Sequence, residues 1–198
     1  MLRGLADSAA RLLVLSVALG VGGYLAWQQV AGPPGPASEL REANPAWTVE
    51  TPRTMGLRLV DASGAEAFVN ADDAGPLRLQ RLDCSTLAAA LPTWLRLPPG
   101  RTAACVQMGD AEPSVRVLNH QTALPVAELW QRHFQPLLDE LELPYWGGHS
   151  GGGRGGNASM SYSVDPAPGT EGPQVNLMAF RRGDETVLVV TLRIMRRP

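Results

Sequence analysis

The chain has 198 residues, a formal net charge of −2 and 44% hydrophobic residues. This length accommodates one domain or two small ones. The hydrophobic content excludes disorder throughout the chain, and the near-neutral charge argues against a nucleic-acid-binding surface. All 17 basic residues are arginines. Without lysine, Schiff-base chemistry and a P-loop for nucleotide binding are excluded.

An uncharged apolar segment, residues 12–31, lies near the N-terminus and reads LLVLSVALGVGGYLAWQQVA. At 1.5 Å per residue, a helix of about 20 residues spans about 30 Å, the hydrocarbon thickness of a bilayer. Tyr24 and Trp27 lie near its end, where aromatic rings favour the headgroup region. The segment therefore predicts a single transmembrane helix that anchors the protein.

The charges that flank this segment predict its orientation. Arg3 and Arg11 precede it, whereas Arg41, the first basic residue after it, has acidic neighbours. The positive-inside rule places residues 1–11 in the cytoplasm and the following domain outside. Because the arginine-only, alanine-rich composition is typical of a bacterial chain, we expect an inner-membrane protein with a periplasmic domain. A cleaved signal peptide and a buried helix of a soluble protein are the alternatives.

Beyond the apolar segment, composition predicts a tether and then one domain. Residues 32–46 are rich in proline and glycine, which predicts a stiff tether that buries little core. Residues 47–198 form the predicted extracytoplasmic domain, with a candidate seam at the proline-rich stretch 91–100. Short alternating segments between residues 57 and 82 predict an upstream β region.

The C-terminal part predicts strands on both sides of one helix. Apolar residues recur at spacings of three and four within residues 125–142, which indicates an amphipathic helix that Pro136 should kink or break. Strands are predicted at residues 103–108, 114–120, 159–164, 175–180 and 186–195. The expected fold is α+β, in the order β-β-α-β-β-β after the upstream region. It has an antiparallel sheet with the helix packed on one face.

Cys84 and Cys105 are the two cysteines of the chain. An even number of cysteines outside the cytoplasm predicts a disulfide. A loop of this size would contribute roughly 3 kcal/mol to stability. Two separate buried thiols are the alternative, and no Cys-x-x-Cys or Cys/His cluster supports a catalytic or metal-binding role.

The glycine-rich segment 147–156 is the least ordinary stretch of the sequence. It contains a formal G-x-G-x-x-G match, but a helix is expected before it and a strand after it, the reverse of a dinucleotide-binding unit. We interpret it as a mobile surface connection. The alternative is a binding loop in which His149, Ser150 and Arg154 meet an anionic partner, beside the aromatic pair Tyr145 and Trp146.

No motif for a cofactor, a metal ion or catalysis is recognisable. The three histidines, His120, His133 and His149, lack the spacing of metal ligands, and no G-x-S-x-G nucleophile motif is present. We therefore expect no cofactor, no metal site and no nucleotide or nucleic-acid partner.

An anchor joined to a domain without reactive motifs favours a non-enzymatic interaction or assembly module of the bacterial envelope. Its expected partner is another envelope protein, bound at an edge strand or at the glycine-rich loop. One alternative is a module that binds a small ligand or cell-wall glycan through its tryptophans and arginines. The other is a hydrolase whose serine, histidine and carboxylate meet only in the fold.

Overall fold

The computed structural model describes residues 35–52, 56–73, 77–110, 114–150, 158–166 and 172–194. Residues Pro36–Pro198 form one compact unit. The predicted cytoplasmic tail at 1–11 and the predicted transmembrane helix at 12–31 lie outside the described residues, as does Arg154. In the part of the chain that the structure describes, no helix is long and apolar enough to cross a membrane.

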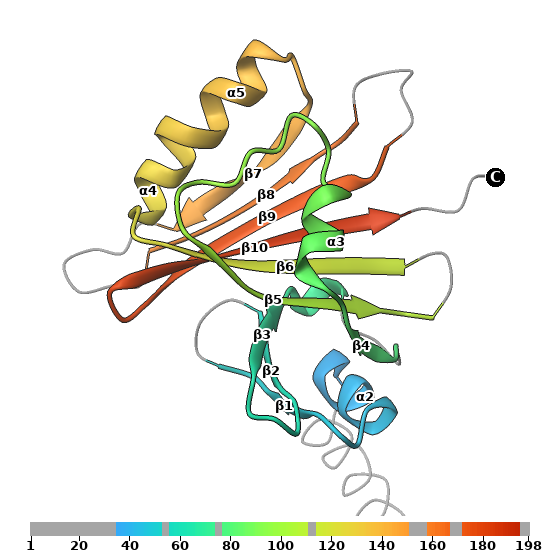
Figure 1. The fold of residues 1–198 in the computed structure, drawn as a ribbon. Coiled ribbons are helices and arrows are strands. Elements are labelled where there is room, and N and C mark those ends of the chain that lie inside the picture. Colours follow the sequence, from blue (N-terminus) through green and yellow to red (C-terminus); the bar gives the residue numbers. More distant parts are fainter. Residues whose placement is uncertain are drawn as a thin grey trace, which may run out of the picture. The chain divides into compact units, whose positions relative to one another are not determined.

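The domain is α+β, with two antiparallel sheets and few helices (Figure 1). The smaller sheet has the order β1-β2-β3, with strands at Thr48–Glu50, Leu57–Val60 and Glu66–Val69. The larger sheet has the order β4-β5-β6-β10-β9-β8-β7, with strands at Leu79–Arg81, Arg101–Met108, Ser114–Thr122, Glu185–Ile194, Gln174–Arg182, Ser159–Val164 and Tyr145–Ser150. The helices are α2 (Pro36–Ala43), η1 (Ala71–Asp73), α3 (Cys84–Ala89), α4 (Val126–Glu128), η2 (Leu129–Phe134) and α5 (Gln135–Glu140).

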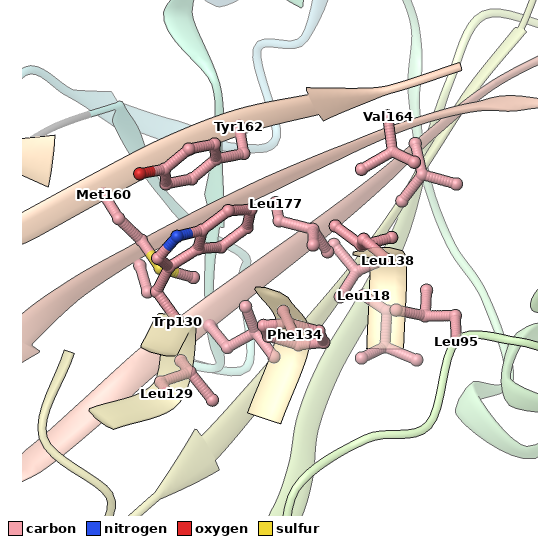
Figure 2. Packing of buried hydrophobic residues seen from close by; sticks show 14 of the residues in the cluster. Leu95, Leu118, Leu129, Trp130, Phe134, Leu138, Met160, Tyr162, Val164 and Leu177 are labelled. Atoms are coloured by element: carbon pink, nitrogen blue, oxygen red, sulfur yellow. The ribbon is translucent and has the colours of Figure 1, made fainter. Parts of the chain in front are cut away.

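Two hydrophobic clusters cover the two faces of the larger sheet. The first lies beneath the helical segments α4, η2 and α5 (Figure 2), and the second includes residues of α2 and of the smaller sheet. Because alternate residues of a strand point to opposite faces, β10 supplies Leu188 and Val190 to the first cluster and Val187 and Val189 to the second. The continuous apolar run of this strand thus matches its central place in the sheet.

The segment predicted as a tether contains helix α2, so that prediction was wrong for these residues. Pro36 begins the helix, where its missing N–H is not needed, and Leu40 is fully buried. The Asn44 side chain, just after the helix, donates to the Leu40 carbonyl (2.8 Å) and accepts from the Leu79 N–H (2.7 Å). The burial of Leu40 and the hydrogen bonds of the Asn44 side chain stabilise this helix, although the segment is rich in proline and glycine.

Part of the glycine-rich segment is a strand rather than a surface connection. Tyr145–Ser150 forms β7 and pairs antiparallel with β8 along its whole length. Four strands therefore follow the helix where the sequence predicted three. Gly147 has a φ of 149°, and a Cβ at this position would collide with the Ser161 carbonyl oxygen. The glycines that suggested a loop instead allow β7 to approach its neighbour closely.

Pro136 is accommodated without a break in the helix, contrary to one of the two predicted outcomes. The segment η2 is π-helical, and the Gln135 N–H donates to the carbonyl of Trp130, five residues back. Proline has no N–H to donate, so the helix lacks one backbone hydrogen bond at Pro136. The wider π-helical turn before it accommodates this loss. Such π-turns inside helices are frequent at functional sites.

A disulfide joins Cys84, at the start of α3, to Cys105 in β5, with a Cα–Cα distance of 5.2 Å. A backbone hydrogen bond from the Leu82 N–H to the Cys105 carbonyl (3.0 Å) lies beside it. The disulfide that the sequence predicted is therefore present, and it ties α3 to the larger sheet across the proline-rich stretch.

Candidate functional site

Three of the four predicted binding residues lie on β7, the outer strand of the larger sheet (Figure 1). Strand alternation sends Tyr145 and His149 to the face covered by the helix and Trp146 to the opposite face. Tyr145 packs against the first hydrophobic cluster, whereas Trp146 is 51% exposed. The structure therefore divides the predicted group between two faces, and Arg154 lies outside the described residues.

Aromatic rings support β7 on its helix-covered face. Trp130 stacks on Tyr162, with 3.4 Å between ring centroids and an interplanar angle of 2°. Tyr145 meets Trp130 edge-on at 5.3 Å. Figure 2 shows the Trp130 and Tyr162 rings facing each other between the helix and the strands. Such contacts contribute about 0.5–1.5 kcal/mol each beyond the buried area, so the rings hold the edge strand in place.

The two tyrosine hydroxyl groups of this aromatic cluster form hydrogen bonds with polar side chains. The Tyr162 hydroxyl oxygen lies 3.2 Å from Nδ1 of His149, and the Tyr145 hydroxyl donates to Asp139 at 3.0 Å. Burial raises the pKa of Tyr162, and the bond to Asp139 is the main cause that raises the pKa of Tyr145. Both phenols therefore stay protonated at neutral pH and serve as hydrogen-bonding groups rather than as bases.

A small hollow of about 50 Å³ opens beside the rings. It is lined by Val126, Ala127, Trp130 and Gln131 of the helix, His149 of β7, and Ala158 and Ser159 at the start of β8. Most of these walls are apolar, and the His149 imidazole is a polar group at the hollow. Sites for whole small molecules occupy about 300–1,000 Å³. This hollow is thus sized for one short side chain.

The outer edge of β7 carries backbone groups that no described strand pairs with. Edge strands expose a row of N–H and C=O groups that can accept another strand. Proteins normally protect such edges with charges, prolines or very short strands. The six residues of β7, YWGGHS, include no proline, no arginine and no acidic residue.

The opposite edge of the same sheet is protected. Strand β4 has three residues. Within it, Nε of Arg81 lies 2.7 Å from Asp61, and Arg78, just before it, lies 3.9 Å from Asp110. A short, charged edge of this kind resists the addition of a strand. Among the described residues, β7 is therefore the less protected edge of the larger sheet.

Neither candidate histidine forms a catalytic arrangement within the described ranges. His120 is 4% exposed, its Nε2 lies 2.9 Å from the Pro98 carbonyl, and burial lowers its pKa. His149 contacts the Tyr162 hydroxyl. Among the described residues, neither ring forms a hydrogen bond with a serine or a carboxylate, and no group of three or more His, Cys, Asp or Glu side chains is placed to hold a metal ion.

Sequence reasoning missed Tyr162 and the outer edge of β7. Met160, Tyr162 and Val164 lie on the same face of a predicted strand. This pattern indicates that Tyr162 is buried, but it does not show which residues Tyr162 contacts. Its partner Trp130 comes from a helix that is distant in sequence, so only the packed fold brings the two rings together.

A free edge strand, an exposed tryptophan and a small apolar hollow are features of a binding surface. Comparison of the chain with protein-family models, with curated proteins and with solved structures found no match in any of the three. The geometry of the site therefore carries the functional conclusion.

Proposed function

We propose that this protein is a non-enzymatic interaction module of the bacterial envelope that binds an extended segment of another envelope protein. The segment adds as a strand to the outer edge of β7. The observation that carries the proposal is the uncharged, unpaired edge of β7 within the described sheet, whose other edge is short and charged. In strand addition, backbone hydrogen bonds supply affinity and side-chain pockets supply specificity.

The faces of β7 define what the added strand would meet. The side chains of the added strand that lie opposite Tyr145, Gly147 and His149 would point to the helix-covered face, where the apolar hollow lies. Its side chains on the other face would pack beside the exposed ring of Trp146. No atom lies within 4 Å of the Gly148 Cβ position, so the face of β7 beside this residue is uncovered. This arrangement favours a guest with a small apolar residue near His149.

Two features of the chain support the envelope location in this proposal. The apolar segment 12–31 has bilayer length and is preceded by arginines, a pattern that favours a cytoplasmic tail at 1–11 and a periplasmic domain. The disulfide between Cys84 and Cys105 suits an oxidising compartment. In this arrangement the domain binds its partner while attached to the inner membrane.

Site-specific photocrosslinking in native membranes tests strand addition. A photoreactive phenylalanine derivative at the Trp146 position should give a discrete crosslinked protein, with the crosslink in an extended segment. Gly148→Lys should abolish it, because a lysine on an edge strand prevents further pairing and the site has room for the side chain. Ala62→Lys, in the exposed β2–β3 turn, is the matched control. A crosslink that survives Gly148→Lys would count against the proposal. So would a crosslink yield at position 146 that is no higher than the yield with the photoreactive residue placed at position 62.

A second candidate, a module that binds a cell-wall glycan, is favoured by one observation. Trp146 is 51% exposed and pairs across the strands with Ser163, which accepts a hydrogen bond from the Asn176 amide (3.1 Å). An exposed aromatic ring beside hydroxyl and amide groups resembles a surface on which a sugar can stack. Muropeptide fragments should then change tryptophan fluorescence in the wild type but not in Trp146→Ala. No change in the wild type would leave strand addition as the better proposal.

A further inference from the structure

A second hollow lies between α3 and strands β5 and β6, away from β7 in the strand order. It is an open cleft of about 320 Å³ lined by Leu82, Asp83, Thr86, Leu87, Gln107 and Arg116. This volume falls within the range of about 300–1,000 Å³ that is typical of small-molecule sites. The disulfide between Cys84 and Cys105 holds α3 against the sheet at this place.

Arg116 is the unusual group in this cleft. It lies in β6, between Gln107 of β5 and Leu192 of β10 in the strand register. Its Nε is buried and has no hydrogen-bond partner, and its guanidinium forms no ion pair with any described residue. A guanidinium keeps its proton at every physiological pH, and a buried donor without an acceptor is destabilising. No described carboxylate balances the charge of Arg116, and an anion in the cleft would pair with the part of the guanidinium that lines it.

The other polar groups of the cleft are already engaged. Asp83 caps α3 and accepts from the Ser85 N–H (3.1 Å), the Ser85 hydroxyl (2.6 Å) and the Thr86 hydroxyl (3.2 Å). These bonds, those from Ser85 first, lower the pKa of Asp83, which therefore stays anionic. Gln107 donates to a backbone carbonyl at 2.9 Å. Arg116 is thus the charged group of the described lining that lacks a partner.

We propose that this cleft binds a small organic monocarboxylate, with the carboxylate on Arg116 and the apolar part against Leu82 and Leu87. The planar guanidinium pairs with a carboxylate through two parallel hydrogen bonds. The ionised Asp83 repels a doubly charged anion such as phosphate more strongly than a singly charged one. The leucine walls favour an organic chain over an inorganic ion. A free short-chain acid and a peptide C-terminus offer this same chemistry.

Isothermal titration of the full-length protein in a non-ionic detergent tests the proposal. Hexanoate represents a free acid, and a tripeptide that ends in leucine represents a C-terminus. Hexanamide, the C-terminally amidated tripeptide and inorganic phosphate are the comparison probes. We expect saturable binding of at least one carboxylate, much weaker binding of its amide and weaker binding of phosphate. The tighter of the two carboxylates identifies the source.

Arg116→Met keeps the apolar stem and removes the charge, and should weaken carboxylate binding about tenfold to a hundredfold, the range for a hydrogen bond to a charged group. Arg96→Met, at an exposed arginine, is the matched control and should not change it. If Arg116→Met lowers the melting temperature, Arg116→Lys replaces it, and the loss of the planar fork should still weaken binding. The β7 variant Gly148→Lys should bind normally, because this proposal does not depend on strand addition.

Three results would overturn the inference. The first is no saturable binding of hexanoate or the leucine peptide at about 10 mM, well above a millimolar dissociation constant. The second is equal affinity of the wild type and a folded Arg116 variant. The third is equal affinity for hexanoate and hexanamide, which would show that only the apolar walls bind the chain.

Discussion

Asn119 shows how a single side chain covers an edge strand. It is 2% exposed and lies in β6, where its Oδ1 accepts from the Phe68 N–H (2.6 Å) and its Nδ2 donates to the Phe68 carbonyl (2.9 Å). Phe68 belongs to β3, an outer strand of the smaller sheet. The amide thus satisfies the N–H and C=O of Phe68, which would otherwise face a foreign strand. The outer edge of β7 has no such partner among the described residues.

The buried carboxylate of Asp73 makes a testable contribution to pH dependence. Its side chain is 2% exposed, and Nε of Arg193 donates to its Oδ1 at 2.6 Å. Burial raises the pKa of Asp73 and outweighs the opposite effect of Arg193. The folded state therefore holds this proton more tightly than the unfolded state. Stability attributable to Asp73 is highest below its unfolded pKa, about 4, and falls as pH rises through the raised folded value.

Asp73→Asn removes this titration. The free energy of unfolding of the wild type should fall, relative to that of Asp73→Asn, as pH rises from about 4. Urea unfolding of both proteins at closely spaced pH values between about 3.5 and 7 measures the difference. Asp184→Asn, at an exposed aspartate in the turn between β9 and β10, is the control. A difference between wild type and Asp73→Asn that is constant, or that changes in the opposite direction, would contradict the assignment.

At the scale of elements, periodicity predicted the strands and the helix well where neighbours in sequence determine the pattern. The amphipathic stripe of residues 125–142 corresponds to α4, η2 and α5, and alternation located β5, β6, β8, β9 and β10. Elements that depend on distant partners were missed. Helix α2 depends on contacts of Leu40 and Asn44 with residues far along the chain, and β7 depends on pairing with β8.

The adjacent glycines of β7 provide a matched pair of substitutions. Gly147→Ala should lower the free energy of unfolding by about 1–3 kcal/mol, because its backbone conformation is strained for other residues and a Cβ would collide with Ser161. Gly148→Ala should be tolerated, because no atom lies within 4 Å of its Cβ position. Chemical denaturation measures both, and amide exchange reports whether β7 detaches. Equal effects of the two substitutions would mean that β7 does not pair as described.

At the scale of the whole molecule, the disulfide connects two parts of the domain. Cys84 and Cys105 are 21 positions apart, and their bond spans the proline-rich stretch between α3 and β5. The double variant Cys84→Ala/Cys105→Ala should lose about 2–4 kcal/mol of unfolding free energy, the typical contribution of a disulfide. Urea unfolding measures the loss. Added reductant should destabilise the wild type by a similar amount and leave the double variant unchanged; a wild type insensitive to reductant would argue against a structural role.

The site was accessible to sequence reasoning only in part. Tyr145, Trp146 and His149 were selected because aromatic and polar groups stand beside glycines, and all three lie on β7. Their division between two faces follows from strand geometry, which a predicted loop does not have. Arg116 carried no signal in the sequence, because an arginine in an alternating strand is ordinarily a solvated residue. Its buried, unpaired Nε became visible only when α3 was placed over β6.

The sequence by itself determined the α+β class, the disulfide pair and the main amphipathic helix. These depend on composition, on cysteine number and on local periodicity, all of which can be read within a few neighbouring residues. Only the tertiary structure decided that β7 is a strand with an open edge, that Trp130 lies on Tyr162, and that Arg116 lies in a cleft without a partner. Strand register and side-chain packing set these features, and both arise from contacts between residues far apart in the chain.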